Sequence, residues 1–203
     1  GLVAPAVRLP DNRPTYYRRF HEGLRGPKGQ QFASHEQVVR GRAISRQIYR
    51  EHLGYVGLRN YLPWSLWDAP LDGRLRRIAL SRRLAAHLRK GLWPEAITDL
   101  DELAQIGFHD AALGSEEVRF LRRGLAHEDA LRELRDVGKV AELRARLQQP
   151  SLHPVRRALA RGVYYQLRGA LAARDYARVR LTAAVMGGVL GARGVISQIA
   201  GRG

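Results

Sequence analysis

Apolar residues recur at helical spacing through almost all of the sequence after residue 74. The first such stripe ends at Gly91, and the next runs from Pro94 to a second glycine, Gly107. Glycine commonly follows the last residue of a helix, and proline fits a helix's first turn. Apolar runs with strict alternation, which a half-buried strand would need, are too short here to predict a sheet. The sequence therefore predicts an all-α fold, built of antiparallel helical hairpins in a small irregular bundle or a short solenoid.

Similar boundary residues continue toward the C-terminal end. Ser115, Pro150, Pro154 and Asp175 are of types that begin or interrupt helices. With these boundaries, the predicted helices cover residues 74–90, 94–106, 115–126, 128–137, 139–148, 154–173 and 175–190.

The first 73 residues have a different composition. Prolines and glycines interrupt residues 1–33, which predicts an extended basic arm. A helix is expected over residues 35–53, opened by a capping box of Ser34 and Gln37 and followed by Gly54. We therefore divide the chain into an arm rich in basic and aromatic residues (1–33), a basic helix with a Trp/Tyr connector (34–73), and a helical-hairpin domain with a basic C-terminal part (74–203).

Positive charge is concentrated at the two ends of the chain. The sequence has 35 Lys and Arg against 19 Asp and Glu, and all but three of the basic residues are arginines. Residues 1–60 have a net charge of +7 and residues 151–203 one of +8, whereas residues 61–150 are close to neutral. Arginine binds phosphate through paired hydrogen bonds and stacks on bases. A surplus of this size favours an anionic partner, with a basic surface that faces only solvent as the alternative.

Three segments combine the residue types that RNA binding needs. In the arm, aromatic rings alternate with guanidinium groups, so the rings can stack on unpaired bases while the arginines hold phosphates; the same segment would also suit a tail that crosses a protein partner. In the helix over residues 35–53, arginines lie largely opposite the apolar residues Val38, Ile44 and Ile48. In the C-terminal part, nine arginines accompany a single acidic residue, Asp175. The candidate RNA-binding residues are Tyr16, Tyr17, Arg18, Arg19, Phe20, Arg40, Arg42, Arg46, Arg50, Arg156, Arg157 and Arg161.

Within residues 74–108, the segment LRKGLWPEAI (88–97) is followed by LDELAQIGF (100–108). A helix that ends at a glycine, a second that opens near Glu-Ala and a closing glycine fill about 35 residues. In this respect the segment resembles one helical hairpin of the tetratricopeptide or pentatricopeptide repeat class. A fainter likeness covers residues 171–185. The resemblance implies a stack of helical hairpins, a common scaffold for binding extended partners.

Two segments allow more than one interpretation. The tryptophans of the connector, Trp64 and Trp67, are interpreted as side chains that fill a gap between helical layers, with a base-stacking platform as the alternative. Residues 181–192 carry no charge and are too short to span a membrane as a helix. We interpret them as a surface that docks against a partner subunit, with an ordinary last core helix as the alternative.

Motifs for catalysis are absent from the sequence. It has no cysteine, no phosphate-binding loop and no zinc-protease or serine-hydrolase motif, and its histidines do not pair at metal-binding spacing. We expect no enzyme activity, no cofactor and no metal. Asp99, Asp101 and Glu102 with Asp110 form the densest acidic group. We expect them to balance the neighbouring basic residues across the hairpin formed by residues 74–108, namely Arg82, Arg83, Arg89 and Lys90.

These observations favour a structural RNA-binding subunit of a large ribonucleoprotein assembly. The expected assembly is a mitochondrial ribosome, in which the protein would be an accessory, arginine-rich matrix component that contacts RNA and neighbouring protein subunits. The alternative is a supernumerary structural subunit of a mitochondrial respiratory or ATP synthase complex, with anionic lipid as a further partner. A free-standing RNA-processing or translation factor made of helical repeats is the third hypothesis.

Overall fold

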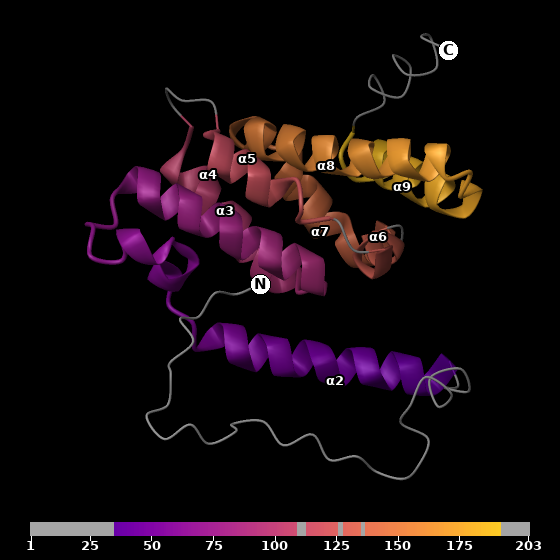
Figure 1. Cartoon of the computed structure of the whole chain (residues 1–203), viewed down its shortest axis with the longest axis horizontal. Helices are drawn as coiled ribbons and strands as arrows, with labels where there is room; N and C mark the ends of the chain where they lie inside the picture. Colours follow the sequence, from indigo (N-terminus) through magenta and orange to yellow (C-terminus); the bar gives the residue numbers. More distant parts are fainter. Residues whose placement is uncertain (1–34, 109–112, 126–127, 135–136, 192–203) are drawn as a thin grey trace. The chain divides into compact units, whose positions relative to one another are not determined.

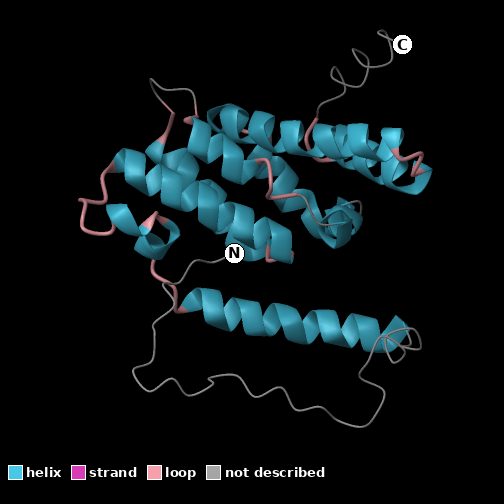
Figure 2. Ribbon diagram, in the orientation of Figure 1, coloured by secondary structure: helices cyan, strands magenta, loops and turns pink. Residues whose placement is uncertain are grey.

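A computed structural model describes residues 35–108, 113–125, 128–134 and 137–191. In these residues the chain forms eight α-helices and three short 3₁₀ helices, and no strand is present among them (Figure 2). The all-α prediction is therefore confirmed. The chain divides into two compact units, residues 1–56 and residues 57–203, and each is described here by itself.

The described part of the first unit is one helix, α2 (His35–Gly54). Its bounds agree with the expected 35–53 helix, whereas Ser34 of the expected capping box lies outside the described residues. Gln47 donates a hydrogen bond to Glu51, one turn further along the helix. Ile44 and Ile48, which the sequence places on the apolar side, are 59% and 58% exposed. Within the first unit, the apolar side of α2 is therefore largely exposed at these two positions.

The second unit begins with two 3₁₀ helices, η1 (Leu58–Tyr61) and η2 (Trp64–Leu66). Tyr61 is buried, because η1 packs against α3. The Trp67 indole donates a hydrogen bond to the carbonyl oxygen of Leu62, which keeps this ring half-buried within the connector. Trp64 is 80% exposed, so the prediction that it fills a gap between helices is wrong. In the connector, Tyr61 has that role instead.

Helices α3 (Gly73–Lys90) and α4 (Trp93–Ile106) form a hairpin, as expected for residues 74–108 (Figure 1). The Asp72 side chain accepts a hydrogen bond from the Leu75 amide and so caps the start of α3. Gly91 ends α3 with a φ of 67°, in the left-handed region that glycine adopts at little cost. Gly107 ends α4, also with a positive φ. The hairpin is present, and its membership of the tetratricopeptide or pentatricopeptide class stays a prediction.

Six further segments complete the second unit. They are α5 (Ser115–Leu121), α6 (Glu128–Leu134), α7 (Val137–Leu147), η3 (Pro150–Leu152), α8 (His153–Ala172) and α9 (Tyr176–Gly188). The two last helices lie side by side as a second hairpin, and α5 packs against both α3 and α8 (Figure 1). Through α5, the two hairpins of this unit are held in one body.

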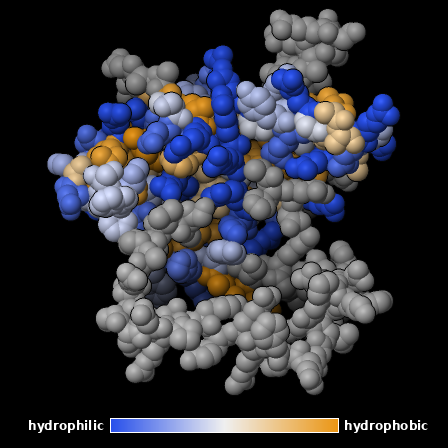
Figure 3. Space-filling view, viewed as in Figure 1, coloured by the Kyte–Doolittle hydropathy of each residue, from blue (hydrophilic) through white to orange (hydrophobic). Residues whose placement is uncertain are grey.

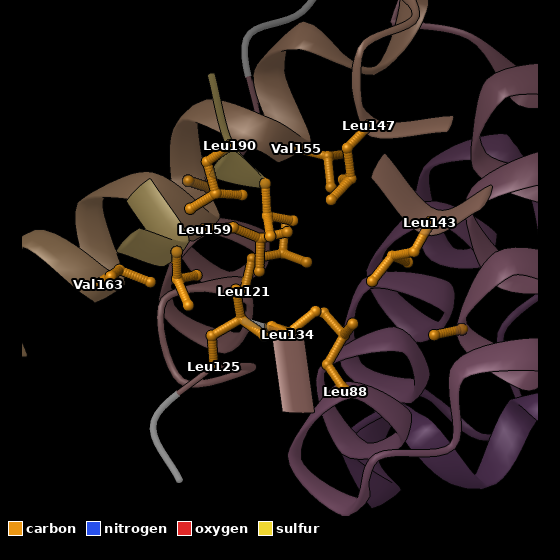
Figure 4. Packing of buried hydrophobic residues seen from close by; sticks show 14 of the residues in the cluster. Leu88, Leu121, Leu125, Leu134, Leu143, Leu147, Val155, Leu159, Val163 and Leu190 are labelled. Carbon is orange, nitrogen blue, oxygen red and sulfur yellow. The ribbon is translucent and has the colours of Figure 1, made fainter. Parts of the chain in front are cut away.

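One hydrophobic cluster joins these helices. It is rich in leucine, and side chains from α3, α5, α7 and α8 point toward one another, as Figure 4 shows for Leu88, Leu121, Leu143 and Leu159. The end of α9 and the residues after it belong to the same cluster. Buried members from this segment are Leu181, Val185, Met186, Val189 and Leu190.

Burial of that segment corrects an expectation. The sequence favours a docking surface over residues 181–192, but the large apolar side chains of residues 181–190 already face the chain's own core. Side chains that are covered in this way contribute hydrophobic stabilisation to the fold and offer little area to a second protein. The interpretation as an ordinary last core helix is therefore confirmed for these residues.

Candidate nucleic-acid interface

The arginines of the α3–α4 hairpin are neutralised by carboxylates. Arg83 donates to Asp99 at 2.7 Å and to Glu102 at 2.8 Å, and the second oxygen of Asp99 lies 2.7 Å from the His87 ring. Burial alone would lower the pKa of Arg83, but the charges of Asp99 and Glu102 more than offset it, so the pKa is raised above its usual value. Further pairs join Arg76 to Glu102, Arg77 to Glu117 and Arg146 to Asp101.

These pairs confirm that the acidic group of α4 balances arginines across the hairpin. Of the expected partners, Arg83 is paired with two of these carboxylates, whereas Arg82 and Arg89 bond to the backbone carbonyls of Tyr61 and Ala85. Asp101 pairs with Arg146 of α7 instead of an arginine of the hairpin, and Asp110 lies outside the described residues. In the near-neutral middle of the sequence, many positive charges thus also lie next to carboxylates in the folded structure. Guanidinium groups that are paired with carboxylates in this way attract an external anion only weakly.

Helices α8 and α9 present the opposite situation. Seven arginines lie on them and on the turn between them, and none of the seven side chains has a hydrogen bond or an ion pair within the described ranges. Five of the seven are exposed, and the set consists of Arg156, Arg157, Arg161, Arg168, Arg174, Arg178 and Arg180. This hairpin therefore carries a dense positive charge that the described part of the protein does not neutralise.

The only acidic residue in residues 151–203, Asp175, already has another role. Its side chain accepts a hydrogen bond from the backbone amide of Arg178 and so caps the N-terminus of α9. A carboxylate at this position also favours the positive end of the helix dipole. Asp175 thus caps the helix, and among the residues that the structure describes no carboxylate pairs with the neighbouring guanidinium groups.

Basic residues line one side of α8. His153, Arg157, Arg161 and Arg168 follow one another at spacings of four and seven residues, which places them within roughly 80° around the helix axis. Arg157 and Arg168 are separated by about 16 Å along this axis, at 1.5 Å per residue. Figure 3 shows many hydrophilic side chains on the viewed face of the second unit, with apolar ones between them. Such a row of charges can follow a phosphate backbone.

A pocket opens between α5 and the N-terminal turns of α8. It has a volume of about 320 Å³. Its apolar wall comes from both helices and from the residues just before α5, and its basic wall comes from α8. The lining residues are Leu113, Val118, His153, Pro154, Arg157, Ala158 and Arg161.

Beyond the pocket, the same two helices bring guanidinium groups onto aromatic rings. Arg122, just after α5, lies 5.6 Å from the ring centroid of Tyr165 on α8. Nearby, Phe120 lies between two guanidinium groups, with Arg82 at 4.9 Å and Arg119 at 5.1 Å from its centroid. A guanidinium group over a ring in this way is attracted electrostatically by the face of the ring. The α5–α8 seam thus combines a pocket, free positive charge and aromatic rings.

Positive charge is also uncompensated beside α5. Burial lowers the pKa of Arg89, and the charges of Arg123 and Arg82 lower it further. A basic group has a lowered pKa where it is desolvated or surrounded by like charge. The region where α3 meets the end of α5 therefore has a positive potential of its own, in addition to that of α8.

The candidate residues from the sequence are distributed unevenly. Arg157 and Arg161 lie on the pocket wall, whereas Arg156 is half-buried and does not line the pocket. Arg46 and Arg50 lie on α2, and each has an interaction of its own. Five of the other seven lie outside the described residues: Tyr16, Tyr17, Arg18, Arg19 and Phe20. The last two, Arg40 and Arg42, lie on α2, but their side chains are outside the described part of the structure.

Sequence reasoning missed part of this surface. Val118 and Leu113 are separated from Arg157 by about forty residues, so no local motif connects the two walls of the pocket. Arg122 and Tyr165 are likewise brought together only by the packing of α5 on α8. The available signal was the four-residue spacing of His153, Arg157 and Arg161, which marks one face of a helix.

No group of three His, Asp or Glu residues in the described ranges is arranged to hold a metal ion. Among the helices that the structure describes, none has the length and apolar character needed to cross a membrane. Comparisons with known proteins find no match to a family model, to a curated protein or to a solved structure.

Proposed function

We propose that this protein is a non-catalytic, RNA-binding structural subunit of a large ribonucleoprotein assembly. The observation that carries the proposal is the row of arginines on α8 and α9, which has no carboxylate partner among the described residues. Phosphate groups of RNA are the polyanion that such a row fits, because arginine binds phosphate oxygens bidentately.

The contrast between the two hairpins supports this proposal. On α3 and α4, the positive charges are neutralised within the chain, because carboxylates lie 2.7–3.2 Å from the guanidinium groups. On α8 and α9 the chain supplies one carboxylate and uses it as a helix cap. Like charges left at this density repel one another and destabilise the compact state. An external polyanion removes that cost and gains affinity by releasing its condensed counterions.

The proposal extends to the kind of assembly that the sequence analysis favours, an accessory protein of the mitochondrial ribosome in the matrix. An RNA-facing side on α8 and α9 suits a protein at the surface of folded RNA. Ile44 and Ile48 on α2 are more than half exposed, and a neighbouring protein subunit would bury this apolar area favourably. The protein would then contact RNA with one unit and a protein neighbour with the other.

Salt dependence of RNA binding tests the proposal. The purified full chain is titrated with a fluorescent single-stranded RNA at several KCl concentrations, and the logarithm of the binding constant is plotted against that of salt. Each arginine–phosphate contact contributes about −0.7 to this slope for single strands. Replacement of Arg168 and Arg180 by Gln is expected to make the slope shallower by about 1.4.

The matched control removes the same charge from compensated positions. Arg76 and Arg146 both form ion pairs with carboxylates, so Arg76→Gln with Arg146→Gln is expected to leave the slope nearly unchanged. If the two double variants changed the slope equally, only net charge would matter, and the α8–α9 surface would lose its special role. If the chain bound no RNA even at low salt, the proposed function would be wrong.

A further inference from the structure

The pocket between α5 and α8 has the size and chemistry of a site for one nucleotide. Its volume of about 320 Å³ lies at the lower end of the range of small-molecule sites in proteins. One wall is apolar, and the other carries two exposed guanidinium groups, of Arg157 and Arg161. We propose that this pocket binds a single unpaired nucleotide of the RNA, an inference that rests on the proposed function.

The apolar wall fits a base. Leu113 and Val118 are half-buried and face the space from the α5 side, while Pro154 and Ala158 face it from α8. Aliphatic side chains such as these can contact a base on its face without reading its edges. Unpaired bases of RNA are commonly turned out of the helix and bound in such pockets.

The basic wall fits the phosphate of the same nucleotide. Arg157 and Arg161 lie one helical turn apart, so their Cα atoms are separated by about 6 Å along α8. Neither has a hydrogen bond or an ion pair in the described ranges, so both guanidinium groups can turn toward one phosphate. His153 adds a ring nitrogen at the same wall. One pocket thus has an apolar wall that can contact the base and a basic wall that can bind the phosphate.

The path of the strand continues along the seam. Arg161 belongs to the pocket wall, and one turn further along α8 lies Tyr165, with Arg122 against its ring. Tyr165 is 55% exposed, so its ring has a free part that a second base can cover. A single strand that enters the pocket can therefore run on past Tyr165 toward Arg168. Recognition of this kind depends on bases that are not paired.

Binding of two matched strands tests the inference. One is a single-stranded RNA of about twelve nucleotides, and the other has the same ribose-phosphate backbone without bases. The unchanged chain is expected to bind the normal RNA about tenfold more tightly than the strand without bases. Val118→Phe fills the pocket and leaves every charge in place, so it is expected to lower this ratio at least threefold, while a base that covers Tyr165 keeps the remainder.

Circular dichroism would show whether Val118→Phe disturbs folding. If it does, a second variant tests the pocket. Arg157→Gln with Arg161→Gln alters only exposed side chains. Because a base seated in the pocket is what brings its phosphate onto these two groups, this double substitution is expected to weaken binding of the normal RNA at least threefold more than binding of the strand without bases. Arg168→Gln with Arg180→Gln, which lie outside the pocket, should weaken both strands alike and keep the ratio. Equal binding of both strands by the unchanged chain, or a tenfold ratio retained in the pocket variants, would overturn the pocket site while RNA binding stands. Failure to bind either strand would instead refute the proposed function.

Discussion

Gly162 of α8 lies directly against the backbone of Arg122. A Cβ atom built on this glycine would stand 2.8 Å from the carbonyl carbon of Arg122 and 2.9 Å from its Cα. The absence of a side chain therefore lets α8 approach the end of α5 closely. This approach brings Tyr165 beneath Arg122 and forms one border of the basic seam.

Replacement of Gly162 by Ala should separate the two helices. The added methyl group overlaps the Arg122 backbone, which cannot rotate away as a side chain would. Overpacking of this kind costs roughly 1–3 kcal/mol of unfolding free energy. Urea denaturation would measure the loss. Gly169→Ala is the control, because nothing lies within 4 Å of its Cβ position and alanine favours a helix by about 1 kcal/mol. Equal effects of the two substitutions would contradict the close approach.

Asp99 is the carboxylate on which the first hairpin depends. It is 1% exposed and binds both Arg83 and His87. Removal of one member of a buried charged pair costs roughly 3–5 kcal/mol, and because Arg83 keeps its pair with Glu102, the lower end of that range is expected here. Asp99→Asn should therefore lower the free energy of unfolding strongly. Asp101→Asn breaks a more exposed pair with Arg146 and should cost less than about 1 kcal/mol. A small effect of Asp99→Asn in urea denaturation would show that this network is not formed.

Tyr61 should make the fold sensitive to alkaline pH. Burial raises the pKa of its hydroxyl to about 12, with Arg83 lowering it in part and Asp99 raising it. The usual pKa is about 10, so the folded chain holds the Tyr61 proton where the unfolded chain has lost it. Stability from this group is full below pH 10 and is lost between pH 10 and 12, up to roughly 2–3 kcal/mol.

The variant Tyr61→Phe isolates this effect. The buried hydroxyl has no hydrogen-bond partner, so its removal at pH 7 should leave stability unchanged or raise it by about 1 kcal/mol. Above pH 10 the Tyr61→Phe variant should lose less stability than the unchanged chain. Tyr176→Phe, at a 63% exposed position, should lose as much stability as the unchanged chain. Thermal melting between pH 8 and 12 measures the difference. Parallel curves for the Tyr61→Phe variant and the unchanged chain would argue against a buried Tyr61.

Arg174, in the turn between α8 and α9, adopts a backbone conformation that favours glycine. Its φ is 55°, which costs an ordinary residue roughly 1–2 kcal/mol. Arg174→Gly should therefore stabilise the chain by about 1 kcal/mol. Arg174→Ala removes the same charge but keeps the Cβ atom, so it should leave most of the strain. Urea denaturation of both variants separates strain from charge, and equal stabilities would show that charge alone matters.

Most helix boundaries could be predicted because the residues that set them act locally. Gly91 and Gly107 end helices with positive φ, and Asp175 caps α9, each within four residues of the boundary that it defines. The weakest boundary was the end of α5, which stops at Leu121 although the pattern continued to residue 126. There residues 122–125 form a turn, in which the backbone of Arg122 lies against Gly162 of α8 and Gly124 lies close to Leu88 and Leu159.

The candidate site could be predicted only in part. The charge imbalance after residue 150 indicated a basic surface, and two of the candidate residues named from it, Arg157 and Arg161, lie on the pocket wall. The pocket itself depends on Leu113 and Val118, which reach it through tertiary packing. Exposure of Trp64 was also unpredictable, since burial of its neighbour Tyr61 decides which ring packs against α3. Such outcomes depend on contacts between distant segments, which periodicity does not encode.

Sedimentation of the native protein with and without nuclease tests the central claim most directly. If the arginines of α8 and α9 bind RNA, the protein should sediment with a large particle in low salt. Ribonuclease treatment should then move it to the top of the gradient. Cofractionation with a particle that is unchanged by ribonuclease would show that protein or lipid, and not RNA, neutralises this surface.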